Sequence, residues 1–463
     1  MNSTVILLTG QYGTSHKTVA DTLRKMAEKT VPDTLRKRAE EESLAPHPPL
    51  VKTYSIDDAL WKCSNGPTAF FKLPNDKMRD EYWQDAFSLI KRDILNDNPV
   101  YAIVSLHIVY FWEKRFFSCV DWDRLMSLQP RVILTLIDDI YDIYNRIVAD
   151  HKRGSVISDG KISISDILSW RIREIHTCNL LAKNLYVKRE LFPSIDSLLN
   201  KPDAIRSTKI PNLEEELHVI FNQSCDHFVI SVKQNPKDFY CLLFKRKKMR
   251  VYLSFPISKP RENGDNDFFN NLLAFRKKIH KDCIAFDPLA IDELRFVVNK
   301  NKKGNKIVTG KLTDRIIYGI GTPIVSPPAN TPERCPIQED SESLESIYES
   351  VVQQINERDL KLTSQASLVV MWRPLYGKKT HDGVAAEGTF AAAKGITVHS
   401  YHPKQDRIKG KPFIPNIGTQ HQTKDAFFKA IEECQKEYEV KQIEETYCKR
   451  IIKQKEGGSK NEE

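Results

Sequence analysis

Three side chains in the second half of the chain have the chemistry needed to break a bond between a ribose and a base. Glu387 lies near the start of an expected helix, among glycine and alanine residues that would let a sugar approach the backbone. The helix N-terminus would keep this carboxylate ionised at neutral pH, as attack on the C1′ carbon requires. Asp359 could donate a proton to the departing base, and Tyr252 could hydrogen-bond Glu387 and fix its orientation. We therefore expect these three residues to form one catalytic site.

Further polar residues follow the expected strands and turns of the same half. Ser254, Ser258 and Arg261 would favour a phosphorylated substrate over a free nucleoside, because hydroxyl and guanidinium groups bind phosphate. Arg373 follows a strand at the edge where open α/β sheets bind ligands. The alternative is that these are ordinary surface residues. The expected substrate-binding residues are Ser254, Ser258, Arg261, Asp287, Arg373, Asp382 and Gly383.

The first half carries a glycine-rich turn between an expected strand and an expected helix. Gly10 and Gly13 would let backbone N–H groups converge on phosphate oxygens, while Lys17 and Thr18 would reach terminal phosphates and magnesium. The turn departs from the pattern G-x-x-x-x-G-K-[ST], because in strict register His16 replaces the lysine. Mg²⁺ and ATP are therefore expected as cofactors only if this loop is functional.

Two further residues of the first half support a nucleotide-binding role. Asp138 follows another expected strand, and Arg146 lies one to two helical turns later. Together with the turn, they resemble the nucleoside-monophosphate-kinase branch of P-loop proteins. This resemblance implies a P-loop NTPase-like domain that binds nucleotide through Gly10, Gly13, Lys17, Thr18, Asp138 and Arg146. A competent kinase, a nucleotide-binding sensor and a fold kept only as a scaffold are all open alternatives.

The order of motifs in the second half is similar to that of the nucleoside 2-deoxyribosyltransferase family and its N-glycosidase relatives. The resemblance covers about residues 250–428, with a large insertion between 292 and 344. It implies that Glu387 is the nucleophile, that Asp359 contacts the nucleobase and that Tyr252 orients the glutamate. It also implies a homo-oligomer and no required cofactor.

The reaction expected from the residues and the resemblance is cleavage of an N-glycosidic bond, by hydrolysis or by base exchange. The substrate would be a nucleotide or nucleoside, with NAD as a further possibility. A nucleotide-depleting defence effector is one role that suits this combination of domains. The alternatives are a nucleotide kinase and a non-catalytic nucleotide-binding regulator.

Strands alternate with helical patterns along the chain, which predicts two doubly wound, mainly parallel α/β domains. We expect a P-loop NTPase-like domain over 1–245 and a Rossmann- or flavodoxin-like, deoxyribosyltransferase-like domain over 248–463, with an insertion at about 299–343. The local patterns predict a loop over 44–51, a single strand over 100–111, a helix capped by Ser165, and a helix ending at 357.

Composition narrows the classes of protein to which this chain could belong. The 463 residues carry a net charge of +9, which is modest for this length and does not indicate nucleic-acid binding. The nine cysteines are scattered without a CxxC pair, which is typical of reduced thiols in a cytoplasmic protein. We expect no metal site, no membrane partner and no signal peptide.

Overall fold

The chain folds into two compact units. The computed structural model describes residues 3–30, 50–152, 162–199, 225–245, 248–300, 306–312, 344–406 and 417–458. The first unit contains the described residues up to 233 and those between 291 and 354, and the second contains those of 234–290 and from 355 onward. The domains expected from the sequence instead meet at 245–248. Most of the insertion expected at 299–343 lies outside the described residues.

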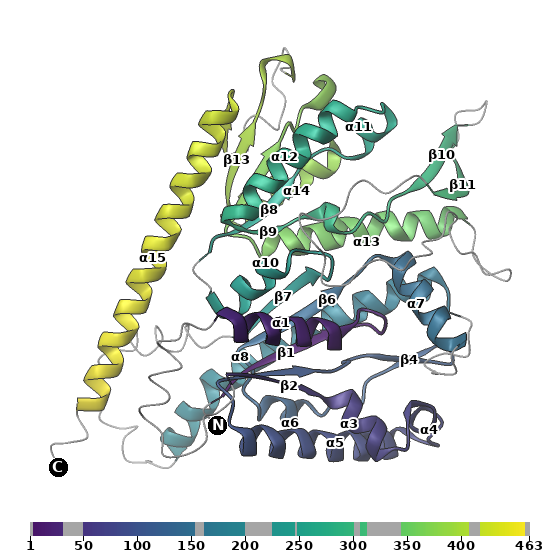
Figure 1. Ribbon diagram of the computed structural model, residues 1–463, viewed down its shortest axis with the longest axis vertical. Helices are drawn as coiled ribbons and strands as arrows, with labels where there is room; N and C mark the ends of the chain where they lie inside the picture. Colours follow the sequence, from purple (N-terminus) through teal and green to yellow (C-terminus); the bar gives the residue numbers. More distant parts are fainter. Residues whose placement is uncertain are drawn as a thin grey trace. The chain divides into compact units, whose positions relative to one another are not determined.

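A five-stranded sheet forms the centre of the first unit (Figure 1). All its strands are parallel, and β6 is buried along its whole length, as expected for a sheet covered on both faces. In sheet order the strands are β2 (Val51–Ser55), β3 (Tyr101–Ser105), β1 (Thr4–Gly10), β6 (Val132–Ile137) and β7 (Asp226–Ser231). The helices are α1 (His16–Thr30), α3 (Ile56–Cys63), α4 (Pro67–Phe71), α5 (Asp76–Asp97), α6 (Trp122–Met126), α7 (Ile140–Lys152) and α8 (Ile164–Leu199).

Two local predictions for the first unit are wrong, and a third is tested only at its end. The apolar run over 100–111 is not one strand, because the chain leaves the sheet after Ser105 and forms a separate antiparallel hairpin of β4 (Tyr110–Trp112) and β5 (Arg115–Phe117). Helix α8 is capped by Ser163, whose Oγ accepts a hydrogen bond from the backbone N–H of Asp166 at 3.0 Å. Residues 44–49 of the expected loop lie outside the described residues, and its last residue, Val51, begins strand β2.

The sheet of the second unit is also five-stranded and parallel. Its order is β14 (Thr419–His421), β13 (Thr397–Tyr401), β12 (Leu368–Trp372), β8 (Arg250–Ser254) and β9 (Ile284–Phe286). From β8 the chain goes to β9 on one side and then returns to β12 on the other. In open parallel sheets such a reversal leaves a crevice at the carboxyl ends of the two central strands. The expected α/β architecture with two mainly parallel sheets is therefore confirmed.

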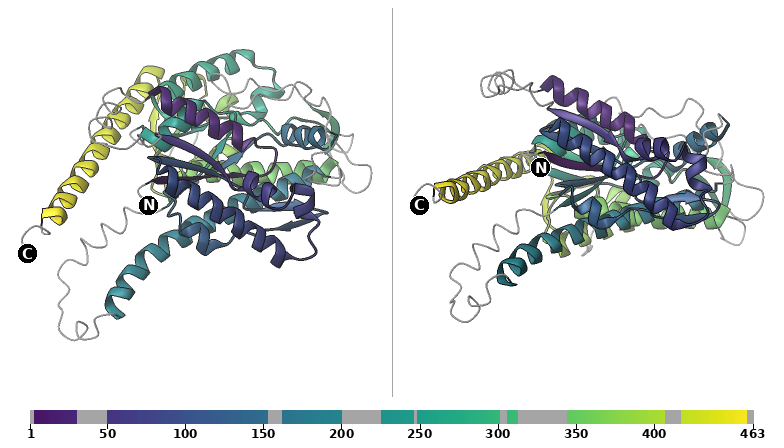
Figure 2. Two further views of the ribbon diagram at one scale, coloured as in Figure 1. Left: turned by 60° about the horizontal axis from the view of Figure 1, so that its bottom comes forward. Right: turned by 90° about the horizontal axis from the view of Figure 1, so that it is seen from below.

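Helices cover both faces of this second sheet. On one face, the Phe275 ring of α12 stacks on the Trp372 ring of β12 at 4.7 Å, and Phe427 of α15 lies 6.2 Å from the same tryptophan ring. Helix α14 packs against β8, β12 and β13. Figure 2 shows that α15 continues as a long helix past the sheet of its own unit. The helices are α10 (Pro236–Tyr240), α11 (Ser258–Glu262), α12 (Asn266–Asp282), α14 (Asp382–Ala393) and α15 (Lys424–Gly458).

Helix α13 (Leu344–Ser364) is longer than expected and includes residue 359, which the sequence pattern placed just after the helix. The boundary between the two units falls within this helix. A hairpin of β10 (Phe296–Lys300) and β11 (Lys306–Leu312) lies in the first unit. Short helical segments occur at Cys241–Lys245, Pro288–Ala290, Tyr376–Lys378 and Lys404–Asp406. Among the helices of the described ranges, none is both long and apolar enough to cross a bilayer.

Candidate functional site

The carboxylate of Glu387 is held by two hydroxyl groups from one strand. Tyr252 and Ser254 are two residues apart on β8, so their side chains lie on the same face of the sheet. The Tyr252 hydroxyl donates to Oε1 of Glu387 at 2.9 Å, and the Ser254 hydroxyl donates to Oε2 at 2.5 Å. Each carboxylate oxygen thus has its own donor, which fixes the orientation of Glu387 at the carboxyl end of β8.

A glycine beside Glu387 lets its helix lie close to the sheet. A Cβ atom on Gly388 would be 3.0 Å from Cε and 3.1 Å from Sδ of Met371 on β12. Met371 pairs in register with Ser254 of β8, so both lie on the face that α14 covers. The small residues around Glu387 therefore permit close packing of α14 on the sheet. That packing brings the carboxylate within reach of the β8 hydroxyls.

A second carboxylate lies close enough to affect the ionisation of the first. Burial and the negative charge of Asp359 raise the pKa of Glu387 to about 8, although the Ser254 and Tyr252 hydroxyls oppose the shift. Burial together with the charges of Asp359 and Glu387 also raises the pKa of Tyr252 well above its usual range. Asp359 itself accepts a hydrogen bond from Nε of Arg358 at 2.9 Å. The structure thus brings the three expected catalytic residues together with Ser254 and Arg358.

The expectation that the helix N-terminus keeps Glu387 ionised at neutral pH is wrong. Glu387 is the sixth residue of α14, whereas the helix dipole acts mainly within the first turn. Burial and the negative charge of Asp359 outweigh the dipole, and they raise the pKa of Glu387 to about 8. Neither cause can be read from the sequence around residue 387, because both come from distant segments.

Asp287 is engaged in a buried ion cluster. Its Oδ2 lies 2.7 Å from Nε of Arg276 and 3.2 Å from Nε2 of His280, and His280 also contacts Asp238 at 2.9 Å. Although burial alone would raise it, Arg276 and His280 lower the pKa of Asp287 to about 2. With its Oδ2 held by two cations, Asp287 has a clear role in stabilising the second unit.

Replacing Asp287 with asparagine is expected to destabilise the second unit by about 3–5 kcal/mol, because it removes the buried carboxylate that pairs with Arg276 and His280. Thermal unfolding followed by circular dichroism measures this loss. The exposed Asp282→Asn is the matched control and should leave the melting temperature unchanged. A variant at 287 that melts like the wild type but binds substrate poorly would instead support the substrate-binding role expected from the sequence.

The other residues expected to bind substrate are either paired with another side chain or exposed at the surface. Arg373 makes a bidentate ion pair with Asp406, with Nε–Oδ2 and Nη2–Oδ1 distances of 2.7 and 2.9 Å. A phosphate at Arg373 would have to share the guanidinium with this carboxylate. Ser258, Asp382 and Gly383 are exposed, and Arg261 of α11 is partly exposed.

The glycine-rich turn of the first unit binds a carboxylate of the same chain. The backbone N–H of Gly10 donates to Oε1 of Glu174 at 3.2 Å, and the N–H groups of Ile108 and Val109 donate to the same carboxylate at 3.1 and 2.8 Å. Burial raises the pKa of Glu174 to about 7 despite these bonds. Gly10 has a φ of +150°, and a Cβ there would lie 2.6 Å from the Leu136 carbonyl oxygen, so only glycine fits.

The remaining residues expected to bind nucleotide separate into two groups. The Arg146 guanidinium donates to the Gly13 carbonyl at 2.6 Å and to Asp138 at 2.5 Å, and Asp138 also pairs with Lys233. Lys17 instead lies on the exterior, with Nζ 2.9 Å from Asp58 and 75% of its side chain exposed. Thr18 is exposed beside it.

Several residues with clear structural connections to these sites were not singled out by the sequence patterns. Glu174 belongs to a long helix and to no local motif, whereas Arg358 adjoins Asp359 in the sequence but was given no role of its own. Ser254 was expected to bind substrate, but its hydroxyl binds Glu387. Comparison with protein-family models and with curated proteins found no match for this chain.

Proposed function

We propose that the second unit cleaves the N-glycosidic bond of a nucleotide or nucleoside, with Glu387 as the nucleophile. The observation that carries this proposal is the Glu387 carboxylate, whose two oxygens are held by separate hydroxyls while a second carboxylate influences its charge. A fixed carboxylate paired with a proton-holding acid is the arrangement used to break glycosidic bonds. Tyr252 and Ser254 act as positioning residues.

The first step forms a bond between a Glu387 oxygen and C1′ while the C1′–N bond breaks. The electron pair of the broken bond leaves with the base, which takes up one proton from Asp359. Because the two carboxyl groups are coupled, they share a proton, and the productive arrangement has it on Asp359 with Glu387 ionised. Burial and the charge of Asp359 raise the pKa of Glu387, so substrate binding has to favour the form with Glu387 ionised.

The second step resolves the glycosyl ester. Water, or a second base in an exchange reaction, attacks C1′ and releases the Glu387 carboxylate. The attacking group gives up its proton to Asp359, which restores the starting state. No electrons enter or leave in either step, so the residues present account for every atom and proton.

Strand order supports a flavodoxin-like topology for the second unit. Numbered along the chain, its sheet has the order 2-1-3-4-5, which is that of flavodoxin-like doubly wound folds. Tyr252 and Ser254 lie on the first of these strands, at the reversal where such folds bind ligands. This placement favours a ligand site beside Glu387, and we infer that the unit is deoxyribosyltransferase-like.

A nucleotide kinase receives weaker support from the first unit. Its parallel sheet and the turn after β1 suit a P-loop-like scaffold. However, Lys17 is paired with Asp58, and the first N–H of the turn is occupied by Glu174. These contacts favour a scaffold or regulatory role over phosphoryl transfer.

The direct test incubates the full chain with separate nucleotides, nucleosides and NAD and measures free base by chromatography, with and without EDTA. We expect release of free base from at least one substrate, unaffected by EDTA. Adding a second, different free base tests exchange against hydrolysis. Phosphoryl transfer from ATP without base release would favour the kinase alternative. Binding without any turnover across the panel would favour the regulator and contradict the proposal.

Replacing Tyr252 with phenylalanine should lower kcat/KM about 10- to 100-fold, because a hydrogen bond to a charged group is worth about 1.5–3 kcal/mol. The hydroxyl also lowers the pKa of Glu387, so its removal should move that pKa upward. Steady-state kinetics across pH measures both effects. Tyr438→Phe, on α15 of the same unit, is the matched control. If Tyr252→Phe retained full activity, Tyr252 would have no positioning role.

A further inference from the structure

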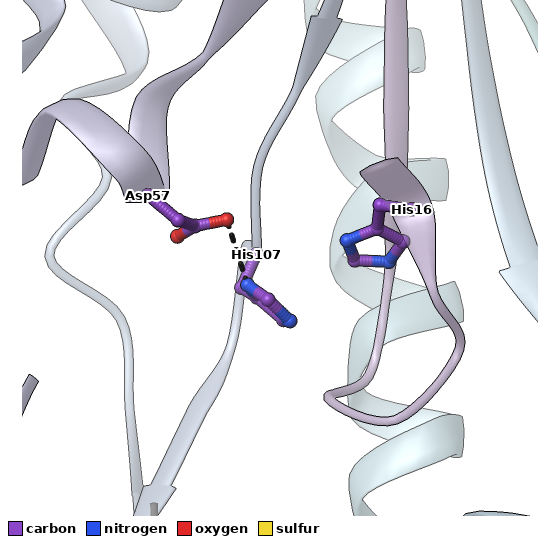
Figure 3. Close-up of side chains that lie close together, drawn as sticks. All are labelled: His16, Asp57 and His107. Atoms are coloured by element: carbon purple, nitrogen blue, oxygen red, sulfur yellow. Dashed lines mark hydrogen bonds and ion pairs between the residues drawn. The ribbon is translucent and has the colours of Figure 1, made fainter. Parts of the chain in front are cut away.

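Two imidazoles and a carboxylate of the first unit form a cluster that the proposed function does not use. His16 is the first residue of α1, Asp57 is the second residue of α3, and His107 lies two residues after β3. Strands β2, β3 and β1 are parallel neighbours, so the segments that follow them meet at one edge of the sheet. Figure 3 shows the three side chains at this edge, with His107 drawn between Asp57 and His16.

The distances within the cluster suit a bound metal ion. One potential ligand atom from each residue lies within 4.8 Å of the other two. The centroids of the His16 and His107 rings are 4.7 Å apart, and Nδ1 of His107 is 2.8 Å from Oδ2 of Asp57. Zinc bonds of about 2.0–2.2 Å separate neighbouring ligands by roughly 3.3 Å in a tetrahedron. Small side-chain rotations would therefore bring all three residues to bonding distance.

His16 supplies a second, independent observation. It is 8% exposed, and its buried Nε2 atom makes no regular hydrogen bond among the described residues, although the imidazole also interacts with the Gly10 backbone. Buried polar atoms in proteins are nearly always paired, because leaving one unpaired costs free energy. Coordination of a metal ion by the imidazole would account for a histidine buried in this position.

A neighbouring tyrosine positions the carboxylate. The Tyr110 hydroxyl donates to Oδ1 of Asp57 at 2.8 Å, which leaves Oδ2 directed at His107. Hydrogen bonds of this kind to ligating carboxylates orient metal ligands in protein sites. Tyr110 begins β4, three residues after His107, so three separate segments of the chain contribute to the cluster.

We propose that His16, Asp57 and His107 bind a divalent transition-metal ion. Two imidazoles and one carboxylate are typical ligands for zinc and similar ions, whereas Mg²⁺ and Ca²⁺ prefer oxygen-only sites. Three protein ligands leave a coordination position for water or a substrate oxygen, as in catalytic zinc sites. This site is independent of the proposed glycosidic cleavage, which uses residues of the second unit.

The test measures Zn²⁺ binding to the full chain after removal of metals with a chelator, by isothermal titration calorimetry and elemental analysis. We expect one equivalent of zinc and a rise in melting temperature when it binds. His107→Asn and Asp57→Asn should each weaken zinc binding at least 100-fold. His176→Asn, at an exposed position of α8, is the matched control and should bind zinc like the wild type.

A second close pair of imidazoles is a competing zinc site that the test has to distinguish from the proposed one. His399 and His421 lie 2.9 Å apart in the second unit, with Cys434 3.5 Å from His399. X-ray absorption of the zinc-loaded wild type needs no variant and should show only nitrogen and oxygen ligands at about 2.0–2.2 Å. A sulfur ligand at about 2.3 Å, or zinc affinity lost in His399→Asn but kept in His107→Asn, would overturn the proposal. So would the absence of stoichiometric binding.

Discussion

Glu387→Gln is expected to abolish release of free base, with kcat/KM falling on the order of 10³-fold or more. An amide cannot form the glycosyl ester, so the variant loses the covalent route and not merely an electrostatic contribution. Glutamine has nearly the same size, and its amide oxygen can still accept the hydrogen bond from Tyr252. Because the substitution also removes the repulsion with Asp359, the melting temperature should be unchanged or slightly higher.

The matched control is Glu437→Gln, at an exposed position of α15 in the same unit. It should retain full activity and stability. Base release is measured by chromatography on the substrate identified from the panel, and folding is checked by circular dichroism. A folded Glu387→Gln protein that releases base at the wild-type rate would rule out nucleophilic attack by Glu387.

The activity of the wild type is expected to fall above a pH of about 8, by tenfold for each further pH unit. The active form needs one proton on the pair formed by Asp359 and Glu387, and the raised pKa of Glu387 marks where that last proton is lost.

The raised pKa of Glu387 also makes the stability of the fold depend on pH. The free energy of unfolding should decrease as pH rises from about 4.5 to 8, because over this range the unfolded chain has lost a proton that the folded protein still holds.

Asp359→Asn separates the two roles of the second carboxylate. Loss of the negative charge should lower the pKa of Glu387, and loss of the acid should reduce kcat about 10²- to 10⁴-fold. The decline in activity above pH 8 should then disappear, since the variant has no proton to lose there. A rate that rises through pH 8 in the wild type would contradict a proton-donating role for Asp359. Urea unfolding of the variant reports any loss of stability around Arg358.

Much of the fold follows from apolar runs in the sequence. Strands such as β1, β6 and β12 are buried on both faces, so they stand out as continuous hydrophobic segments. Strand β2 lies at an edge and is only partly buried, so Val51–Ser55 has no such run and no strand was expected there. The apolar run over 100–111 predicted one strand where there are two, because both of them are buried. Strand β4, which follows β3, is just as buried as β3 itself.

The candidate site was predictable in its residue types but not in its electrostatics. Local motifs indicated Tyr252, Asp359 and Glu387, and the structure brings them together. The role of Ser254 depends on the packing of α14 against β8, which no local pattern reveals. The same limit explains the metal cluster. His16 and Asp57 are 41 residues apart and His107 follows 50 residues later, so only the strand order makes them neighbours.

The Glu174 carboxylate at the Gly10 turn has a consequence for any free anion that approaches this edge of the first sheet. The backbone donors there are already paired with an acceptor tethered to the same chain, whose effective concentration greatly exceeds that of a metabolite in solution. A phosphate can occupy these donors only in molecules where Glu174 has withdrawn. Its apparent affinity is reduced by the rarity of that state. The turn therefore contains its own built-in competitor, and anion binding there is coupled to displacement of a residue in α8.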